Sequence, residues 1–301
     1  MIKIAWNKNY CLDLPESHRF PMEKYELIPL QLIHEGIFKK ENFFSPSSIS
    51  QHNILLTHEK NYVDKLNLGK LSGKEIREIG FPWSKELYKR EKQIVGGTLE
   101  CSLYALKCGV SLNVAGGTHH AHFNKGSGFC ILNDIAITVN TLLKKNKIKK
   151  ALIVDLDVHQ GDGTAKLFEN KKQVFTFSMH GKKNYPLHKQ KSDLDIELDD
   201  NTNDLEYLYL LNISLEDILN QFMPDIVFYQ CGVDVLSTDE LGRLNVSMEG
   251  CRKRDEIVFN TFKKLNIPVV CTMGGGYSKQ IKHILNAHCN TFKSAKKVWE
   301  F

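Results

Sequence analysis

Hydrophobic residues along the chain follow two alternating patterns. Short apolar runs, typical of strands buried on both faces, are followed by longer segments with apolar residues at helical spacing. The predicted strands are a run that begins at Ala151 and residues 2–6, 111–115, 174–178, 225–231 and 268–273. The predicted helices are residues 22–36, 92–109, 133–143, 203–222, 249–265 and 281–289. This alternation predicts an α/β fold with an open, mostly parallel sheet and helices on both faces.

Glycine and proline positions refine this picture in three places. Gly96 and Gly97 predict an interruption of the helix over 92–109. Residues 66–84 have weak periodicity and several glycines, so they predict a loop-rich segment at the rim of a pocket. After the run at Ala151, the glycines at 161 and 163 predict a sharp turn into a helix capped by Thr164.

Composition narrows the class of protein. The 301 residues contain no linker rich in proline, glycine or serine, so we expect a single domain over 1–301. The net charge of +5 is small and the lysines are dispersed, which does not call for nucleic acid. No apolar run approaches a membrane span, and the eight cysteines form no Cys-x-x-Cys pair. We expect a cytoplasmic protein with reduced thiols, of unknown oligomeric state.

Polar residues that could take part in catalysis or metal binding follow four of the predicted strands. Carboxyl ends of parallel strands meet at one edge of a sheet, where ligands bind in such folds. We therefore expect these side chains to converge on one site. They are His119 and His120, then Asp155, Asp157 and His159, then Asp234, and finally Tyr277.

Asp157, His159 and Asp234 have the residue types of a catalytic metal site. Three protein ligands leave a coordination position for water, as catalytic zinc sites require. Iron(II) accepts the same ligand set, so the sequence leaves the choice between Zn²⁺ and Fe²⁺ open. A bound ion of this kind makes water acidic near neutral pH and polarises a carbonyl oxygen.

The remaining polar residues supply acid–base chemistry. His119 and His120 are placed to move protons, and each needs a carboxylate to fix its tautomer. Asp155 and Asp162 are the unassigned carboxylates in the right loop, and Tyr277 follows three glycines that let it present a hydroxyl to an oxyanion. Together these groups predict metal-assisted amide hydrolysis.

Five motifs in order carry a resemblance to a known family. They are Gly116-Gly-Thr-His-His-Ala, Gly128-Phe-Cys-Ile-Leu-Asn-Asp, Val154-Asp-Leu-Asp-Val-His-Gln-Gly-Asp-Gly, Gly232-Val-Asp and Gly274-Gly-Gly-Tyr. Over nearly the whole chain, the sequence resembles the zinc-dependent histone deacetylase family of the arginase/deacetylase superfamily. The resemblance implies an arginase-like open α/β fold and hydrolysis of N-acyl-lysine in peptides or proteins, or of related small acylamines.

The resemblance also implies individual roles. The implied zinc ligands are Asp157, His159 and Asp234. His120 would be the general base and acid, with Asp162 as its partner, and His119 an electrostatic group held by Asp155. Tyr277 would be the oxyanion donor. The implied walls and rim of the acyl-lysine tunnel are Gly128, Phe129, Tyr185 and Leu241. A monovalent cation, usually K⁺, would be held by Asp155, Asp157, His159, Ser178 and Met179, in part through backbone carbonyls.

One departure bears on specificity. Gln160 stands where many family members have a second histidine. Together with residues 178–186 and 239–244, it resembles the class IV-like branch and its bacterial relatives. Some members of that branch favour long fatty acyl groups over acetyl, so the preferred acyl length stays open.

Three other functions compete with this interpretation. An arginase-like dimanganese centre needs a further carboxylate two residues beyond Asp234, where the sequence has Leu236. A non-catalytic binding module would be expected to have lost a metal ligand or Tyr277. Acetylpolyamine hydrolysis is opposed by basic residues in a candidate rim loop, although these also serve solubility; they are Lys182, Lys183, Lys189 and Lys191.

Overall fold

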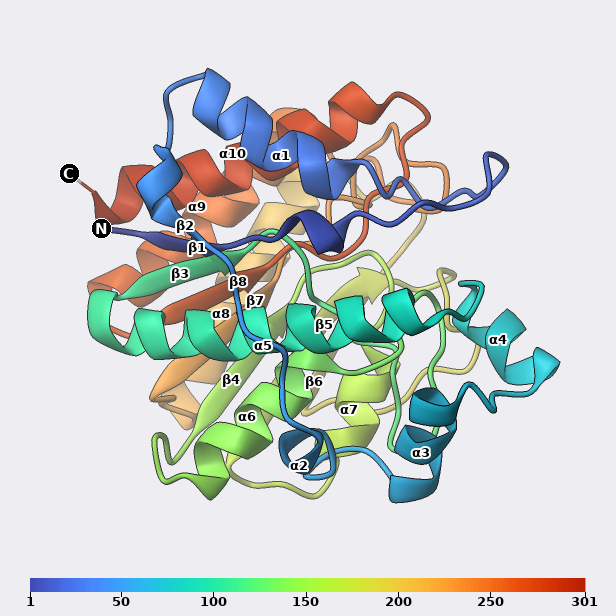
Figure 1. Cartoon of the computed structure of the whole chain (residues 1–301). Helices are drawn as coiled ribbons and strands as arrows, with labels where there is room; N and C mark the ends of the chain where they lie inside the picture. The colour runs from blue at the N-terminus through green and yellow to red at the C-terminus, as the bar shows by residue number, and fades with distance from the viewer. Residues whose placement is uncertain (301) are drawn as a thin grey trace.

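The computed structural model of the protein describes residues 1–300 and centres on one eight-stranded sheet (Figure 1). Its order is β2-β1-β3-β8-β7-β4-β5-β6, and every neighbouring pair is parallel. The strands are β1 (Lys3–Ala5), β2 (Phe43–Phe44), β3 (Val110–Asn113), β4 (Ala151–Asp155), β5 (Val174–Gly181), β6 (Leu194–Leu198), β7 (Ile226–Gln230) and β8 (Val269–Thr272). The predicted α/β class is confirmed.

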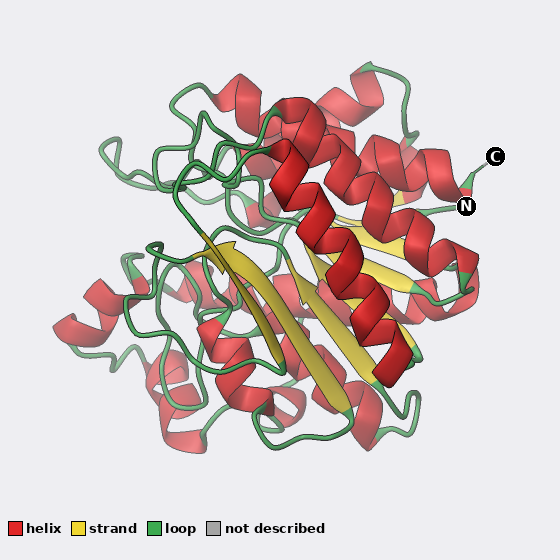
Figure 2. Ribbon diagram, turned by 180° about the vertical axis from the view of Figure 1, so that it is seen from behind, coloured by secondary structure: helices red, strands yellow, loops and turns green. Residues whose placement is uncertain are grey.

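Helices cover both faces of the sheet (Figures 1 and 2). One layer contains α1 (Lys24–His34), α8 (Asp204–Gln221), α9 (Met248–Lys264) and α10 (Ile281–Trp299). The other contains α5 (Lys85–Cys108), α6 (Asp134–Lys144) and α7 (Asp162–Phe168), with the short α2 (Gln51–Ile54) and α3 (Lys60–Leu68) beside them. The 3-10 turns are Lys8–Tyr10 and Lys40–Asn42. None of these helices, within residues 1–300, is long and apolar enough to cross a membrane.

Alternating residues of the central strands contact the two helix layers. In β4, Ala151 and Ile153 belong to the apolar cluster on the side of α5 and α6. Leu152 and Val154 belong to the cluster that includes residues of α8, α9 and α10. Because both faces are buried, these strands are continuous apolar runs rather than alternating ones. This double burial explains why the strands could be predicted from the sequence.

The predicted interruption of the helix over 92–109 was wrong, because α5 is continuous. A Cβ atom at Gly96 would lie 1.7 Å from the backbone oxygen of Ser47, and one at Gly97 would lie 2.4 Å from the hydroxyl of Tyr10. The two glycines therefore let other segments approach the helix closely. They provide space, and the helix keeps its regular geometry through them.

Two further local predictions need correction. The segment over 66–84 contains the helix α4 (Gly73–Ile79), whose N-cap is Ser72. The helix α7 begins at Asp162 after Gly161, so Thr164 lies inside it and is not its cap. The hydroxyl of Thr164 instead accepts a hydrogen bond from the Asn133 side chain at 3.0 Å. Local patterns missed α4 and misplaced the start of α7 because both helices have only seven residues.

Candidate metal centre

Asp157, His159 and Asp234 form a buried group of possible metal ligands at the carboxyl ends of β4 and β7. One ligand atom from each residue lies within 4.8 Å of the others. Nδ1 of His159 lies 3.1 Å from Oδ1 of Asp157 and 3.1 Å from Oδ2 of Asp234. The three side chains, which strand-end positions predicted to converge, are thus brought together by the fold. Their oxygen and nitrogen donors fit a borderline divalent cation such as zinc.

The backbone around this group leaves no room for additional side chains. A Cβ atom at Gly275 would lie 1.9 Å from Oδ2 of Asp234, and one at Gly232 would lie 2.0 Å from Oδ2 of Asp157. The amide of Gly275 donates to that same Asp157 oxygen at 2.8 Å, and the amide of Val158 donates to Oδ1 of Asp234 at 2.9 Å. Glycine is required because the loops approach the carboxylates this closely.

The charges of Asp157, His159 and Asp234 favour the binding of a cation. Burial, together with the charge of Asp157, raises the pKa of Asp234 to about 7. Burial lowers the pKa of His159, but its hydrogen bonds with Asp157 and Asp234 outweigh burial and raise that pKa to about 10. The protein alone therefore retains protons among these groups, and a divalent cation would replace them.

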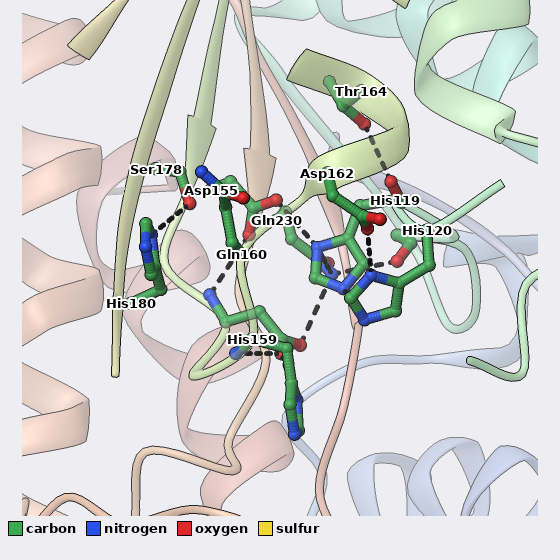
Figure 3. Close-up of polar contacts among 12 residues, drawn as sticks. His119, His120, Asp155, His159, Gln160, Asp162, Thr164, Ser178, His180 and Gln230 are labelled. Atoms are coloured by element: carbon green, nitrogen blue, oxygen red, sulfur yellow. Dashed lines mark hydrogen bonds and ion pairs between the residues drawn. The ribbon is translucent and has the colours of Figure 1, made fainter. Parts of the chain in front are cut away.

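His119 and His120 lie side by side next to the candidate metal ligands (Figure 3). Nδ1 of His119 is 2.7 Å from Oδ2 of Asp155, and Nδ1 of His120 is 2.6 Å from Oδ1 of Asp162. The two Nε2 atoms are 3.1 Å apart. Because each Nδ1 is held by a carboxylate, the Nε2 atoms are the ones available for proton exchange.

The electrostatic environments of the two histidines differ. Burial lowers the pKa of His119, but the carboxylate of Asp155 outweighs burial and raises it to about 9. Burial and the neighbouring His119 lower the pKa of His120 to about 4, against the opposing effect of Asp162. Burial would raise the pKa of Asp162, yet hydrogen bonds from His120 and His122 hold it well below its usual range.

A single buried carboxylate shapes the loop that carries these histidines. Asp134, at the start of α6, accepts hydrogen bonds from the amides of Gly117 and Thr118 at 3.2 and 2.9 Å. It also accepts bonds from the hydroxyls of Thr98 and Thr118 at 2.6 and 2.8 Å. Gly116 and Gly117 have φ values of 86° and 75°, which glycine adopts without steric cost. The loop is therefore fixed from α5 and α6.

Tyr277 lies beside this group, and its loop is held by Asp239, within the segment 239–244, and by Lys24, which no sequence motif assigned to the site. The amide of Tyr277 donates to Oδ2 of Asp239 at 2.6 Å. The fully buried Lys24 donates to the oxygen of Gly274 at 2.9 Å, and its ammonium lies 6.0 Å from the centre of the Tyr277 ring. Burial lowers the pKa of Lys24 to about 8. The signal for Lys24 was its spacing with Ile28 and Leu32 on the buried face of α1.

One cavity of about 630 Å³ connects the group to solvent. His120, His159 and Tyr277 line it, together with all four residues expected in an acyl-lysine tunnel, which are Gly128, Phe129, Tyr185 and Leu241. The ring centroids of His120 and Tyr185 are 4.9 Å apart, and those of Phe129 and Tyr277 are 6.0 Å apart. An aromatic passage therefore leads to the candidate metal ligands.

Phe129 has an unusual backbone for a side chain of its size. Its φ is +64°, a left-handed conformation that bulky residues rarely adopt. Its amide donates to the oxygen of Ile79 at 2.7 Å, and the amide of Gly128 donates to that of Glu78 at 3.0 Å. Both acceptors lie at the end of α4, so this helix places the Phe129 ring in the cavity wall.

Comparison with known proteins places this geometry in a family. Residues 18–292 match the family model described as the histone deacetylase domain. The chain belongs to the histone deacetylase family. It is accordingly a deacetylase-like hydrolase, as the sequence predicted.

Relatives of this deacetylase-family chain extend over almost its full length. It is 42% identical to an uncharacterized protein of Picosynechococcus sp. over 98% of this chain and 99% of that protein. It is 29% identical to histone deacetylase 2 of Arabidopsis thaliana, over 94% of this chain and 76% of that protein. The crystal structure of an HDAC homolog from Aquifex aeolicus has a TM-score of 0.83 at 23% identity, covering 99% of this chain and 88% of that one. An HDAC homolog complexed with SAHA matches with the same values.

Gln160, the departure from the deacetylase pattern, points away from the metal ligands. Its side-chain nitrogen donates to the oxygen of Gln190 at 2.6 Å and to Oδ1 of Asp195 at 2.8 Å. Its side-chain oxygen accepts from the amide of Gln190 at 2.8 Å. Gln160 thus ties the metal loop to the segment before β6. Leu236, where a binuclear centre would need a carboxylate, is buried in the apolar core.

His58 fixes the far side of the deacetylase histidine loop. Its Nδ1 donates to the oxygen of His122 at 2.8 Å, and its Nε2 accepts from the amide of Asn133 at 3.0 Å. This pattern requires a neutral ring. Burial lowers the pKa of His58 to about 4 from 6.5. Between pH 4 and 6.5 the unfolded state therefore binds more protons than the folded state. The contribution of His58 to the free energy of unfolding is fully present above pH 6.5 and is lost as the pH falls towards 4.

We expect acidification from pH 7 to pH 5 to lower the free energy of unfolding by about 2 kcal/mol through His58, given its pKa values of 6.5 and about 4. The variant His58→Asn keeps a hydrogen-bond donor and removes the titration, so it should lose less stability over this range. Urea unfolding at both pH values measures the difference. His52→Asn, at an exposed position of α2, is the matched control. Equal pH dependence in wild type and His58→Asn would contradict this role.

Proposed function

We propose that the protein hydrolyses the amide bond of N-acyl-lysine in peptides or proteins, with Zn²⁺ as its metal ion. One observation carries the proposal. His159, His120 and Tyr277 all line one aromatic cavity. They offer a possible metal ligand, an imidazole held by a carboxylate, and a tyrosine side chain. Amide hydrolysis needs these three chemical elements in one place.

The metal would be held by Asp157, His159 and Asp234. The donor set and the protons retained on these buried groups fit a divalent cation. When bound, the ion supplies Lewis acidity for an amide carbonyl and for water. The amides of Gly275 and Val158 orient the carboxylates, because each donates a hydrogen bond to one of their oxygens.

His120 would move the protons of the reaction. Asp162 holds its Nδ1 at 2.6 Å, so Nε2 would take a proton from the attacking water and later give it to the leaving amine. His119, with Nδ1 on Asp155 and Nε2 3.1 Å from that of His120, would stabilise charge beside it. The two carboxylates fix the orientation of both rings, and each ring then presents its Nε2.

Tyr277 would donate a hydrogen bond to the oxygen that becomes negative during attack. Burial and the charges of Asp234 and Asp157 raise the pKa of its hydroxyl well above the usual value, so the hydroxyl keeps its proton. Lys24 supports the loop through the oxygen of Gly274. Such a donor acts most strongly as the oxyanion forms.

Part of the cavity wall suits the apolar methylenes of an acylated lysine. Gly128, Phe129, Tyr185 and Leu241 would surround the lysine methylenes. A related protein has been crystallised with SAHA, which is consistent with an acyl-lysine-like ligand. Hydrolysis of a small acylamine is the alternative, and the preferred acyl length is a separate question.

We also infer a structural monovalent cation, K⁺, beneath the metal. In the buried residues Asp157 and His159, the backbone oxygens accept no hydrogen bond from any residue in the described range 1–300. Asp155 and Ser178 are paired across β4 and β5 next to them, and Met179 follows Ser178 in β5. Oxygen atoms without donors suit a hard cation.

Amine release from one lysine peptide carrying an acetyl, decanoyl or myristoyl group tests the function. We expect the zinc-loaded protein to hydrolyse at least one of these peptides, and Asp157→Ala to abolish hydrolysis because a metal ligand is lost. The order of rates reports the acyl length for which the cavity is built. Hydrolysis of acetylpolyamines alone would favour the small-acylamine alternative, and hydrolysis of neither class would refute the proposal.

His120→Ala should retain the metal and lower kcat by about 10²- to 10⁴-fold, because it removes the proton-transfer group and leaves the ligands intact. Turnover of the acyl-lysine peptide and the metal content of the purified variant are both measured. His188→Ala, which removes an exposed histidine outside the cavity, is the control. Substantial activity in His120→Ala would show that another group is the base.

Tyr277→Phe should lower kcat by about 10²- to 10³-fold with little change in KM, because the lost hydrogen bond matters mainly as the oxyanion forms. Steady-state kinetics on the same peptide separate the two parameters. Tyr209→Phe, at an exposed position of α8, controls for the substitution itself. A rise in KM at unchanged kcat would instead indicate a role in substrate binding.

A further inference from the structure

Positive charge surrounds the mouth of the cavity. Five basic side chains line it, all exposed, and they come from five separate segments of the chain: Arg19, Arg77, Lys125, Lys183 and Arg243. Glu78 is the only acidic side chain among the described residues of this lining. The rim lysines named in the sequence analysis contribute only Lys183 to it. A long stretch of sequence separates each of these residues from the next, so the local sequence did not reveal the cluster.

Three of the five cations have no acidic partner among residues 1–300. Lys183 and Arg243 share Asp200, each at 3.3 Å. Within residues 1–300, no carboxylate oxygen lies within 4.0 Å of the charged nitrogens of Arg19, Arg77 or Lys125, since none of the ion pairs of the described chain includes them. These charges are therefore available to a ligand.

The positively charged region ends at Arg19 and Tyr277, which separate the cavity from a second groove. These two residues also line a neighbouring groove of about 500 Å³, whose other charged residues are mostly acidic. They are Asp13, Glu16, Glu23 and Glu240, with Lys279 as the exception. The basic mouth is thus a local feature of the catalytic cavity and is not produced by the net charge of the whole chain.

Arg19 connects the basic mouth to the passage below it. Its guanidinium carbon lies 5.4 Å from the centre of the Phe129 ring, which forms part of the cavity wall. An acylated lysine that reaches His120 must pass this ring, and the residues before and after that lysine then lie among the cations. Carboxylates at those positions would complement the mouth, whereas a cationic chain would be repelled.

We propose that the basic mouth selects acyl-lysine within acidic peptide segments, with Arg19, Arg77 and Lys125 as specificity-determining residues. This inference rests on the proposed function, because it names the peptide class that the same cavity takes. It also disfavours acetylpolyamines, whose free amines carry positive charge. Because the contacts are exposed, the selectivity falls as ionic strength rises.

The test compares two peptides of equal length that differ only in the residues beside the acyl-lysine. One has two glutamates on each side, and the other has two lysines. An exposed ion pair contributes about twofold, so we expect kcat/KM to favour the acidic peptide on the order of tenfold at low salt, and less at 0.5 M NaCl. An uncharged, capped acyl-lysine amide measures turnover that does not depend on flanking charge.

Charge reversal in the mouth should remove this preference. We expect Arg77→Glu with Lys125→Glu to equalise or invert the ratio, and the rate on the capped amide corrects for any change in turnover itself. Lys144→Glu with Lys147→Glu changes the net charge equally at exposed positions outside the cavity, and it should keep the ratio. Equal rates for the two peptides with the wild-type protein, or the same loss of preference in both double variants, would overturn the inference.

Binding separates this inference from the proposed function. Fluorescence anisotropy of the two labelled peptides is measured with the wild type and both double variants. If neither the peptides nor the capped amide is hydrolysed, the proposed function fails, and binding still decides the inference. Tighter binding of the acidic peptide that only the mouth variant loses supports the basic mouth, and equal binding of both peptides refutes it.

Discussion

Carboxylates buried at one edge of the sheet impose the strongest constraint on this structure. Asp155, Asp157, Asp162 and Asp234 are at most 6% exposed, and a buried charge is costly unless it is paired and hydrogen-bonded. Four imidazoles and several backbone amides meet part of this demand, and a divalent cation would meet the rest. The glycine-rich loops follow from the same constraint, because only a bare backbone can bring its amides so close to the carboxylate oxygens.

Buried cations stabilise these loops from the side of the helices. The guanidinium of Arg254, in α9, donates to the oxygens of Gly232 at 2.6 Å and Cys231 at 3.2 Å. It also pairs with Asp255 at 2.9 Å, so its own charge is compensated. Lys24 makes the corresponding contact to Gly274 from α1. The loops after β7 and β8 are therefore each held by a cation from a different helix, through the carbonyl groups of Cys231, Gly232 and Gly274.

Those parts of the fold that depend on periodicity could be predicted from the sequence. Central strands buried on both faces are continuous apolar runs, and the grouping of Asp157, His159 and Asp234 follows from the geometry of parallel strands. Prediction failed where contacts with a segment that is distant in the sequence determine the local structure. Gly96 accommodates the backbone at Ser47, a contact that no local pattern reveals. The edge strand β6 was not among the predicted strands, because it is half exposed and lacks an apolar run.

The lysines of the predicted rim loop show a second limit of prediction from sequence. Lys189 directs its ammonium back to the oxygens of Asn184 and Pro186 at 2.5 and 2.7 Å, and so braces its own loop. Arg19 and Lys125, from distant parts of the chain, line the cavity instead. Sequence composition identifies basic residues, but the direction of a long side chain is set by which carbonyl or aromatic groups it meets in the folded protein.

Asp239 connects the cavity rim to Tyr277 through hydrogen bonds. One carboxylate oxygen accepts from the amides of Leu241 and Gly242, both at 2.9 Å, while the other accepts from the amide of Tyr277 at 2.6 Å. A displacement of the rim is therefore transmitted to the tyrosine through one rigid carboxylate. Residues of a substrate that contact Leu241 would in this way influence turnover as well as affinity, so that recognition at the surface adjusts the alignment of the hydroxyl inside the cavity.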